Sequence, residues 1–204
     1  MHFEKNHLYH IYNRGNISQK IFYQRDNYLF FLKKIKQYVT PYGDILAWCL
    51  MPNHFHLMVY VNHVELPAFI ERLTRSEILN KSSAKNRTFN ESIGIMLRTY
   101  TRAIQKQEKT NGSLFQEHTK AICLTRHDGI DKAWFDMEYG TIISQSSSEK
   151  EYPAVCFKYI HQNPVAANLC DESTSWEFCS VPDYCDGRNG KLVNRQRAEE
   201  FGLI

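Results

Sequence analysis

The sequence predicts an α+β fold built on a ferredoxin-like (RRM-like) antiparallel sheet of four to five strands with helices packed on it. Two observations lead to this prediction. Residues 8–61 alternate between strand and helix patterns in the order strand, helix, strand, strand. The chain of 204 residues is also long enough to bury one proper core.

The first strand and helix follow from composition and periodicity. Residues 8–14 are rich in aromatic and β-branched side chains and end at Gly15, which is typical of a strand. A helix with an apolar face is then predicted from an N-cap at Asp26 to about Val39, and the Pro-Tyr-Gly run at 41–43 breaks it.

A hairpin comes next. Residues 44–51 are largely apolar, Pro52-Asn53 turns the chain, and residues 54–61 return as a third strand. Together with the first strand and helix, this order opens a ferredoxin-like sheet with helices on one face.

The middle of the chain predicts two more helices. Residues 66–80 have helical spacing, and the polar, basic residues 81–89 are expected to form a loop. A third helix is predicted from a cap at Asn90 or Ser92 to just before Asn111-Gly112.

The C-terminal half predicts one more strand and one more helix. Residues 121–124 form the apolar part of an extended segment, and the acidic residues 127–150 are interpreted as an insertion or lid. Pro153 suits the first turn of a helix that is expected to stop at Pro164. We therefore expect one domain over residues 1–187 with a polar C-terminal tail at 188–204.

Composition limits the class of protein. The 25 basic and 22 acidic residues nearly balance, so overall charge argues neither for nor against nucleic acid. The six cysteines are scattered without a CxxC pair, which favours free thiols in a reducing compartment. No apolar run reaches membrane-spanning length and no signal-peptide pattern is present, so a cytoplasmic location is predicted.

Two histidines open the third strand. Side chains on a strand alternate between faces, so His54 and His56 point the same way and Phe55 points the other way. Two imidazoles on one rigid face are a ready pair of metal ligands. A strand that merely carries two histidines is an equally good interpretation of this motif alone.

Two histidines alone do not complete a metal site, and the last predicted helix offers further candidate residues. Tyr159 and Asn163 lie one turn apart on one face. Asn163 can supply a carbonyl oxygen as third metal ligand, and Tyr159 can present its phenol to a metal-held substrate. Two nitrogens and one oxygen with open positions suit Mg²⁺ or Mn²⁺. Taken alone, this pair is better explained as an ordinary half-buried helix tyrosine and a residue near the C-terminal end of the helix.

Tyr100 is the competing tyrosine. It stands in a basic setting, but its helical neighbours Met96, Leu97 and Ile104 are apolar, and Ile104 at i+4 cannot bind a metal. These neighbours favour a structural role for Tyr100.

Several ordered motifs carry a family resemblance. They are Tyr9-His10-Ile11-Tyr12-Asn13-Arg14-Gly15-Asn16, Trp48-Cys49-Leu50-Met51-Pro52-Asn53-His54-Phe55-His56-Leu57, Gly112-Ser113-Leu114-Phe115-Gln116 and Tyr159-Ile160-His161-Gln162-Asn163-Pro164-Val165. Together they resemble the REP-associated tyrosine transposases, which are single-tyrosine HUH transposases of the insertion-sequence type. The resemblance covers about residues 6–187, the acidic segment 127–150 excepted.

The resemblance implies an HUH endonuclease fold and a DNA nicking and joining enzyme. It makes His54, His56 and Asn163 the ligands of Mg²⁺ or Mn²⁺ and Tyr159 the nucleophile that forms a 5′-phosphotyrosine intermediate. The implied substrate is single-stranded DNA that contains a hairpin. A homodimer and a monomer both stay open.

Basic side chains of the middle segment are expected to hold DNA phosphates. They are Arg98, Arg102, Lys106 and Lys109, with Arg14 near the first strand. A solvated helix face explains any one of them equally well.

Other enzymes with an HxH motif do not fit the residues that follow it. A metallo-β-lactamase-type site continues as HxHxDH, and a histidine-triad hydrolase needs a third alternating histidine, but Leu57-Met58-Val59 follow here. The remaining alternative is a non-catalytic, domesticated protein that binds hairpin DNA without cutting it.

Overall fold

The computed structural model describes residues 1–67, 86–126, 134–137, 140–143, 151–185 and 187–204. The strands are β1 (Leu8–Arg14), β2 (Gly43–Met51), β3 (His54–Val61), β4 (Glu65–Pro67), β5 (Asn86–Thr88), β6 (Lys120–Cys123), β7 (Trp134–Met137) and β8 (Gly140–Ile143). The α-helices are α1 (Arg25–Tyr38), α2 (Phe89–Glu108), α3 (Tyr152–Ala166), α4 (Val181–Tyr184) and α5 (Arg195–Glu200), and η1 (Asn16–Ser18) and η4 (Ser173–Ser175) are short 3-10 helices. Among these residues no helix combines the length and the apolar character needed to cross a bilayer.

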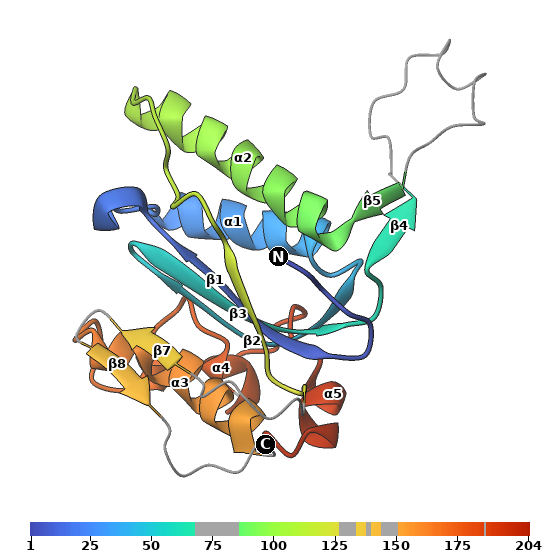
Figure 1. Ribbon diagram of the computed structural model, residues 1–204. Coiled ribbons are helices and arrows are strands. Elements are labelled where there is room, and N and C mark those ends of the chain that lie inside the picture. Colours follow the sequence, from blue (N-terminus) through green and yellow to red (C-terminus); the bar gives the residue numbers. More distant parts are fainter. Residues whose placement is uncertain (68–85, 127–133, 138–139, 144–150, 186) are drawn as a thin grey trace.

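The central sheet has four antiparallel strands in the order β2-β3-β1-β6. Taken with α1 and α2, this is the ferredoxin-like arrangement, because β3 inserts between the two strands that α1 connects. The predicted fold class is therefore confirmed (Figure 1).

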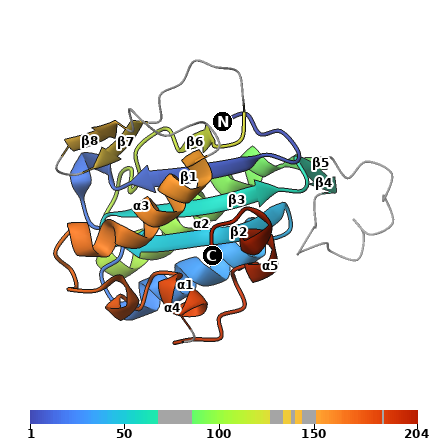
Figure 2. The ribbon, with the colours of Figure 1, turned by 90° about the horizontal axis from the view of Figure 1, so that it is seen from below.

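Helices were predicted on one face of the sheet, but both faces are covered. On the first face Tyr9, Ile11, Phe55 and Leu57 belong to the core shared with α1 and α2. On the second face, residues such as Met58 pack with α3 and the C-terminal segment. Figures 1 and 2 show α1 and α2 on one side of the sheet and α3 on the other. Alternation along each strand therefore supplies two separate apolar layers.

Two predicted helix caps are wrong. Gln24, not Asp26, caps α1, because extended Gln24 forms a reciprocal capping box with Asn27. Thr88, not Asn90 or Ser92, caps α2 through the capping box that Thr88 forms with Glu91.

The first two residues of the helix predicted at 66–80 belong to a strand instead. Leu66 and Pro67 belong to β4, which pairs with β5. The rest of the helix predicted at 66–80 lies outside the described residues, as do 81–85 of the predicted loop. The end of that loop is the short strand β5, and Phe89 already belongs to α2.

Pro164 does not stop α3, which continues to Ala166. Pro164 lies in the last turn of α3, and its missing N–H removes one helical hydrogen bond. Asn168 adopts a left-handed φ of 52° and its N–H bonds to the carbonyl of Val165, while the N–H of Leu169 bonds to the carbonyl of Pro164. This Schellman motif, not the proline, ends the helix.

The acidic segment contains a β-hairpin of β7 and β8, and its residues 127–133, 138–139 and 144–150 lie outside the described residues. The segment 188–204, predicted as a polar tail, packs on the sheet. Val193 forms a parallel bridge with Ile45, Ala198 is buried, and Arg197 lies over the Tyr60 ring.

Candidate metal and nucleophile site

The face of the sheet toward α3 carries the two predicted metal ligands. β1 and β3 pair so that Tyr12 lies opposite His56 and Arg14 lies opposite His54. Directly opposed residues share a face, so His10, two residues before Tyr12, also belongs to it. Polar and aromatic side chains from two adjacent strands therefore meet at one end of the sheet.

His54 connects β3 to α3. Its Nδ1 lies 2.6 Å from Oδ1 of Asn53, and its Nε2 lies 3.1 Å from Oδ1 of Asn163. A neutral imidazole has one N–H, so it can donate to only one of these two oxygens. The other nitrogen then faces an oxygen lone pair, so this nitrogen and oxygen could both serve as ligands of a cation.

His56 is buried beside His54, with ring centroids 4.9 Å apart. Its Nδ1 lies 2.9 Å from Nε2 of His10, while its own Nε2 is buried without a hydrogen-bond partner. Burial, and then the positive charges of neighbouring groups, holds the pKa of His56 well below its ordinary value. Burial also lowers the pKa of His10, to about 3. Both imidazoles are neutral at pH 7, which is the form that binds metals.

Tyr159 reaches the same place from α3. Its ring centroid lies 5.4 Å from that of His56 and 6.0 Å from that of His10, edge-on in both cases. Asn163, one helical turn later, contacts His54. The structure therefore brings His54, His56, Tyr159 and Asn163 together within one chain.

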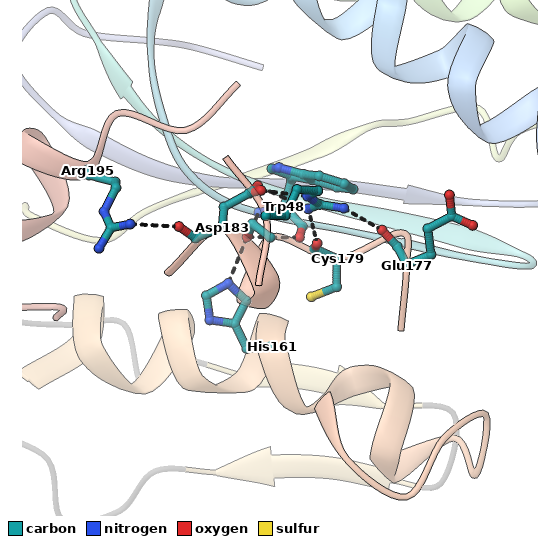
Figure 3. A network of polar contacts seen from close by, with 8 residues as sticks. Trp48, His161, Glu177, Cys179, Asp183 and Arg195 are labelled. Atoms are coloured by element: carbon teal, nitrogen blue, oxygen red, sulfur yellow. Dashed lines mark hydrogen bonds and ion pairs between the residues drawn. The ribbon is translucent and has the colours of Figure 1, made fainter. Parts of the chain in front are cut away.

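A buried polar network fixes α3 against the sheet (Figure 3). The Ser180 hydroxyl accepts a 2.9 Å hydrogen bond from the Trp48 backbone N–H and donates to the Trp48 carbonyl at 3.1 Å. Nε2 of His161, in α3, lies 2.7 Å from the same hydroxyl. Since His161 lies midway between Tyr159 and Asn163 in the sequence, this network determines the position of the helix that carries both.

Arg188 organises the loop that supplies Ser180. It donates to both carboxylate oxygens of Asp183, at 2.6 and 3.0 Å, and to the carbonyls of Glu177 and Cys179. Arg195 donates to the Asp183 carbonyl at 3.0 Å (Figure 3). The C-terminal segment is therefore part of the framework behind the site.

The donor set fits a hard divalent cation. Within the described residues no three His, Cys, Asp or Glu side chains group to hold a metal ion, so the histidine pair would need a third ligand of another kind. The amide oxygen of Asn163 lies 3.1 Å from Nε2 of His54. His54, His56 and the Asn163 oxygen are such a set, and Nε2 of His56 is a buried nitrogen with no protein partner. Two imidazole nitrogens and one amide oxygen are ligands that Mg²⁺ or Mn²⁺ accepts when substrate oxygens and water complete the shell.

Tyr100 does not belong to this site. It is fully buried in the core under α1 and α2, and its hydroxyl donates a 2.6 Å hydrogen bond to the carbonyl of Ile21. Burial raises the pKa of its phenol. The structural role favoured by its sequence neighbours is confirmed.

The predicted DNA-binding residues divide into two places. Arg14 lies beside His54 on the sheet. Four others are exposed on or just after α2, on the opposite side of the sheet: Arg98, Arg102, Lys106 and Lys109. Arg98 and Arg102 line a groove of ≈ 770 Å³ between α2 and residues 113–119. The site and the basic face of α2 are therefore separate surfaces.

His10 is a neighbour of the site that was not predicted as a site residue. Its signal was present, because His10 and Tyr12 alternate along β1 as His54 and His56 alternate along β3. What the sequence lacked was the register that places the two pairs on one face.

Comparison with known proteins gives a fold relationship. No protein-family model and no curated protein matches the chain. Among solved structures, a REP-associated tyrosine transposase bound to a REP hairpin is similar over 95% of this chain and 92% of that chain, with a TM-score of 0.55 and 13% identity. The chain has the fold of that transposase. At this identity the likeness establishes the fold alone, so the activity of the chain has to be argued from its own residues.

Proposed function

We propose that this protein is a metal-dependent transposase that cleaves single-stranded, hairpin-containing DNA through a 5′-phosphotyrosine intermediate and rejoins strands. The observation that supports it most directly is the convergence of Tyr159 and Asn163 on the pair His54 and His56. Two kinds of independent support exist, the ordered sequence motifs and the fold shared with a hairpin-bound transposase.

Each proposed residue has one task. His54 and His56 would hold Mg²⁺ or Mn²⁺ through ring nitrogens, and Asn163 through its amide oxygen. When bound there, the ion would polarise the scissile phosphate and offset negative charge that develops on its oxygens. Tyr159 presents its phenol from a helix that the buried Ser180 network holds in place.

The reaction is a balanced exchange of phosphodiester bonds. The phenol oxygen of Tyr159 loses its proton and forms a bond to phosphorus, while the bond from phosphorus to the 3′ oxygen breaks and that oxygen takes up a proton. A 3′-hydroxyl reverses the step and releases the tyrosine. Because the phosphotyrosine retains the bond energy, rejoining needs no ATP.

Labelled hairpin DNA with single-stranded flanks tests this proposal. With Mg²⁺ or Mn²⁺ we expect a covalent protein–DNA adduct on a denaturing gel, and EDTA should abolish it. Tyr159→Phe should form no adduct, while Tyr100→Phe, the matched control, should still form one. Binding of the hairpin without an adduct under any metal would instead favour the non-catalytic hairpin-binding protein.

The location of Tyr159 also favours cleavage in cis, since tyrosine and histidines of one chain already meet. Mixing Tyr159→Phe with His56→Ala should then restore no adduct. Restoration by the mixture would mean that the tyrosine acts across a dimer.

A further inference from the structure

His10 contacts the proposed metal ligand His56 directly. It lies in β1 opposite Met58, and its Nε2 is 2.9 Å from Nδ1 of His56. Both histidines are almost fully buried, at 1% and 3% exposure, and their rings stack with centroids 5.1 Å apart at an interplanar angle of 25°. Tyr12 stacks on His10 from the same strand, with centroids 4.7 Å apart.

The contact links the protonation of the two rings. In a hydrogen bond between two neutral imidazoles one nitrogen carries the proton and the other accepts it. If Nδ1 of His56 carries the proton, it donates to His10, and Nε2 of His56 keeps a bare lone pair. Among the described residues no group hydrogen-bonds to that buried Nε2. A metal ion bound at Nε2 would select this direction, because a coordinating nitrogen cannot carry a proton.

We propose that His10 is a positioning residue that accepts a hydrogen bond from Nδ1 of His56 and so keeps Nε2 of His56 unprotonated and turned toward the metal site. The inference rests on the proposed function, because it gives His10 a role toward the ion of that function. Outer partners of this kind fix the tautomer and orientation of a ligating histidine and increase its basicity.

Three variants separate this role from simple packing. His10→Phe keeps a flat ring but removes the acceptor. His10→Gln retains an oxygen that can accept from His56. Met58→Leu is the matched control, because Met58 is the buried residue directly opposite His10 and makes no hydrogen bond to His56.

Two measurements are needed, neither of them catalytic. The first is Mn²⁺ affinity, measured from the electron paramagnetic resonance signal of the free ion. We expect 10–100-fold weaker binding in His10→Phe, the range typical for loss of an outer-shell partner. His10→Gln should recover most of the affinity, and Met58→Leu should equal wild type.

The second is the tautomer of His56 in the Mg²⁺-bound wild-type protein, read from ¹⁵N chemical shifts and assigned by its loss in His56→Gln. We expect the proton on Nδ1. A proton on Nε2 overturns the inference even if His10→Phe fails to fold. Wild-type Mn²⁺ affinity in His10→Phe also overturns it but leaves the proposed function intact. Absence of Mn²⁺ binding by the wild-type protein overturns the metal part of the proposed function together with the inference.

Discussion

Replacing Ser180 by alanine removes a single oxygen atom but should destabilise the protein strongly. The hydroxyl is fully buried and accepts hydrogen bonds from the Trp48 N–H at 2.9 Å and from Nε2 of His161 at 2.7 Å. It donates its own proton to the Trp48 carbonyl, which also accepts from the Ser180 backbone N–H at 2.9 Å and so keeps a partner. The variant therefore leaves two buried donors without acceptors.

The expected loss follows from these two donors. Each buried polar group without a partner costs ~1–3 kcal/mol, so two of them cost ~2–6 kcal/mol, and local relaxation places the loss toward the lower part of this summed range. We expect the free energy of unfolding to fall by about 2–4 kcal/mol, which is large for a point substitution. A domain with a stability of ~5–15 kcal/mol remains folded after such a loss.

Urea unfolding followed by tryptophan fluorescence measures the effect. The midpoint should fall while the slope m stays constant, because the surface exposed on unfolding does not change. Ser175→Ala is the control, since this serine is exposed in η4 and should change stability by less than ~0.5 kcal/mol. If Ser180→Ala behaves like the control, the account of the network that holds α3 is refuted.

Three further outcomes test other parts of the structure. Tyr100→Phe should lose about 1–2 kcal/mol of stability by urea unfolding, because its 2.6 Å hydrogen bond to a buried carbonyl is removed. Although burial opposes ionisation, hydrogen-bond donors and the charge of Arg197 hold the pKa of Asp44 below its ordinary value of 3.8. The stabilisation from Asp44 is therefore present above about pH 4 and lost as pH falls through the lowered pKa, so Asp44→Asn should be less stable than wild type at pH 6 and approach it in acid. The double variant Arg98→Gln with Arg102→Gln should reduce the salt slope of hairpin binding by about 1.4–1.8, from two phosphate contacts.

Each of these predictions has a contrary result. A Tyr100→Phe protein that is as stable as wild type would contradict its buried hydrogen bond. A stability difference between wild type and Asp44→Asn that persists unchanged to pH 2 would contradict the lowered pKa. An unchanged salt slope in the double arginine variant would assign the basic face of α2 to solvent and not to DNA.

Local patterns determined the strands and most of the helices. Residues 8–14, 44–51 and 54–61 were predicted as strands within a residue of their observed bounds, because turn residues and β-branched or aromatic composition act over a few neighbours. The positions of the helix N-caps were predicted less accurately. The periodicity of an apolar face gives the middle of a helix, whereas the first residue depends on which side chain satisfies the free N–H groups.

The histidine pair, Tyr159 and Asn163 could be proposed from spacing and family motifs. Their spatial relation could not be derived from the sequence, because the contact between His54 and Asn163 joins residues 109 positions apart. It depends on α3 packing against the face of the sheet opposite α1 and α2, which is decided by the buried layer around Met58 and by the Ser180 network.

The sequence by itself therefore determined the order of the elements, the alternation that places His54 and His56 on one face, and the helical turn that joins Tyr159 to Asn163. Only the tertiary structure decided that the two halves meet and that His10 contacts His56, 46 residues away. The physical reason is that alternation and helical periodicity are properties of neighbours in the chain. The register between strands and the choice of face by a helix are determined by side chains that meet only after folding.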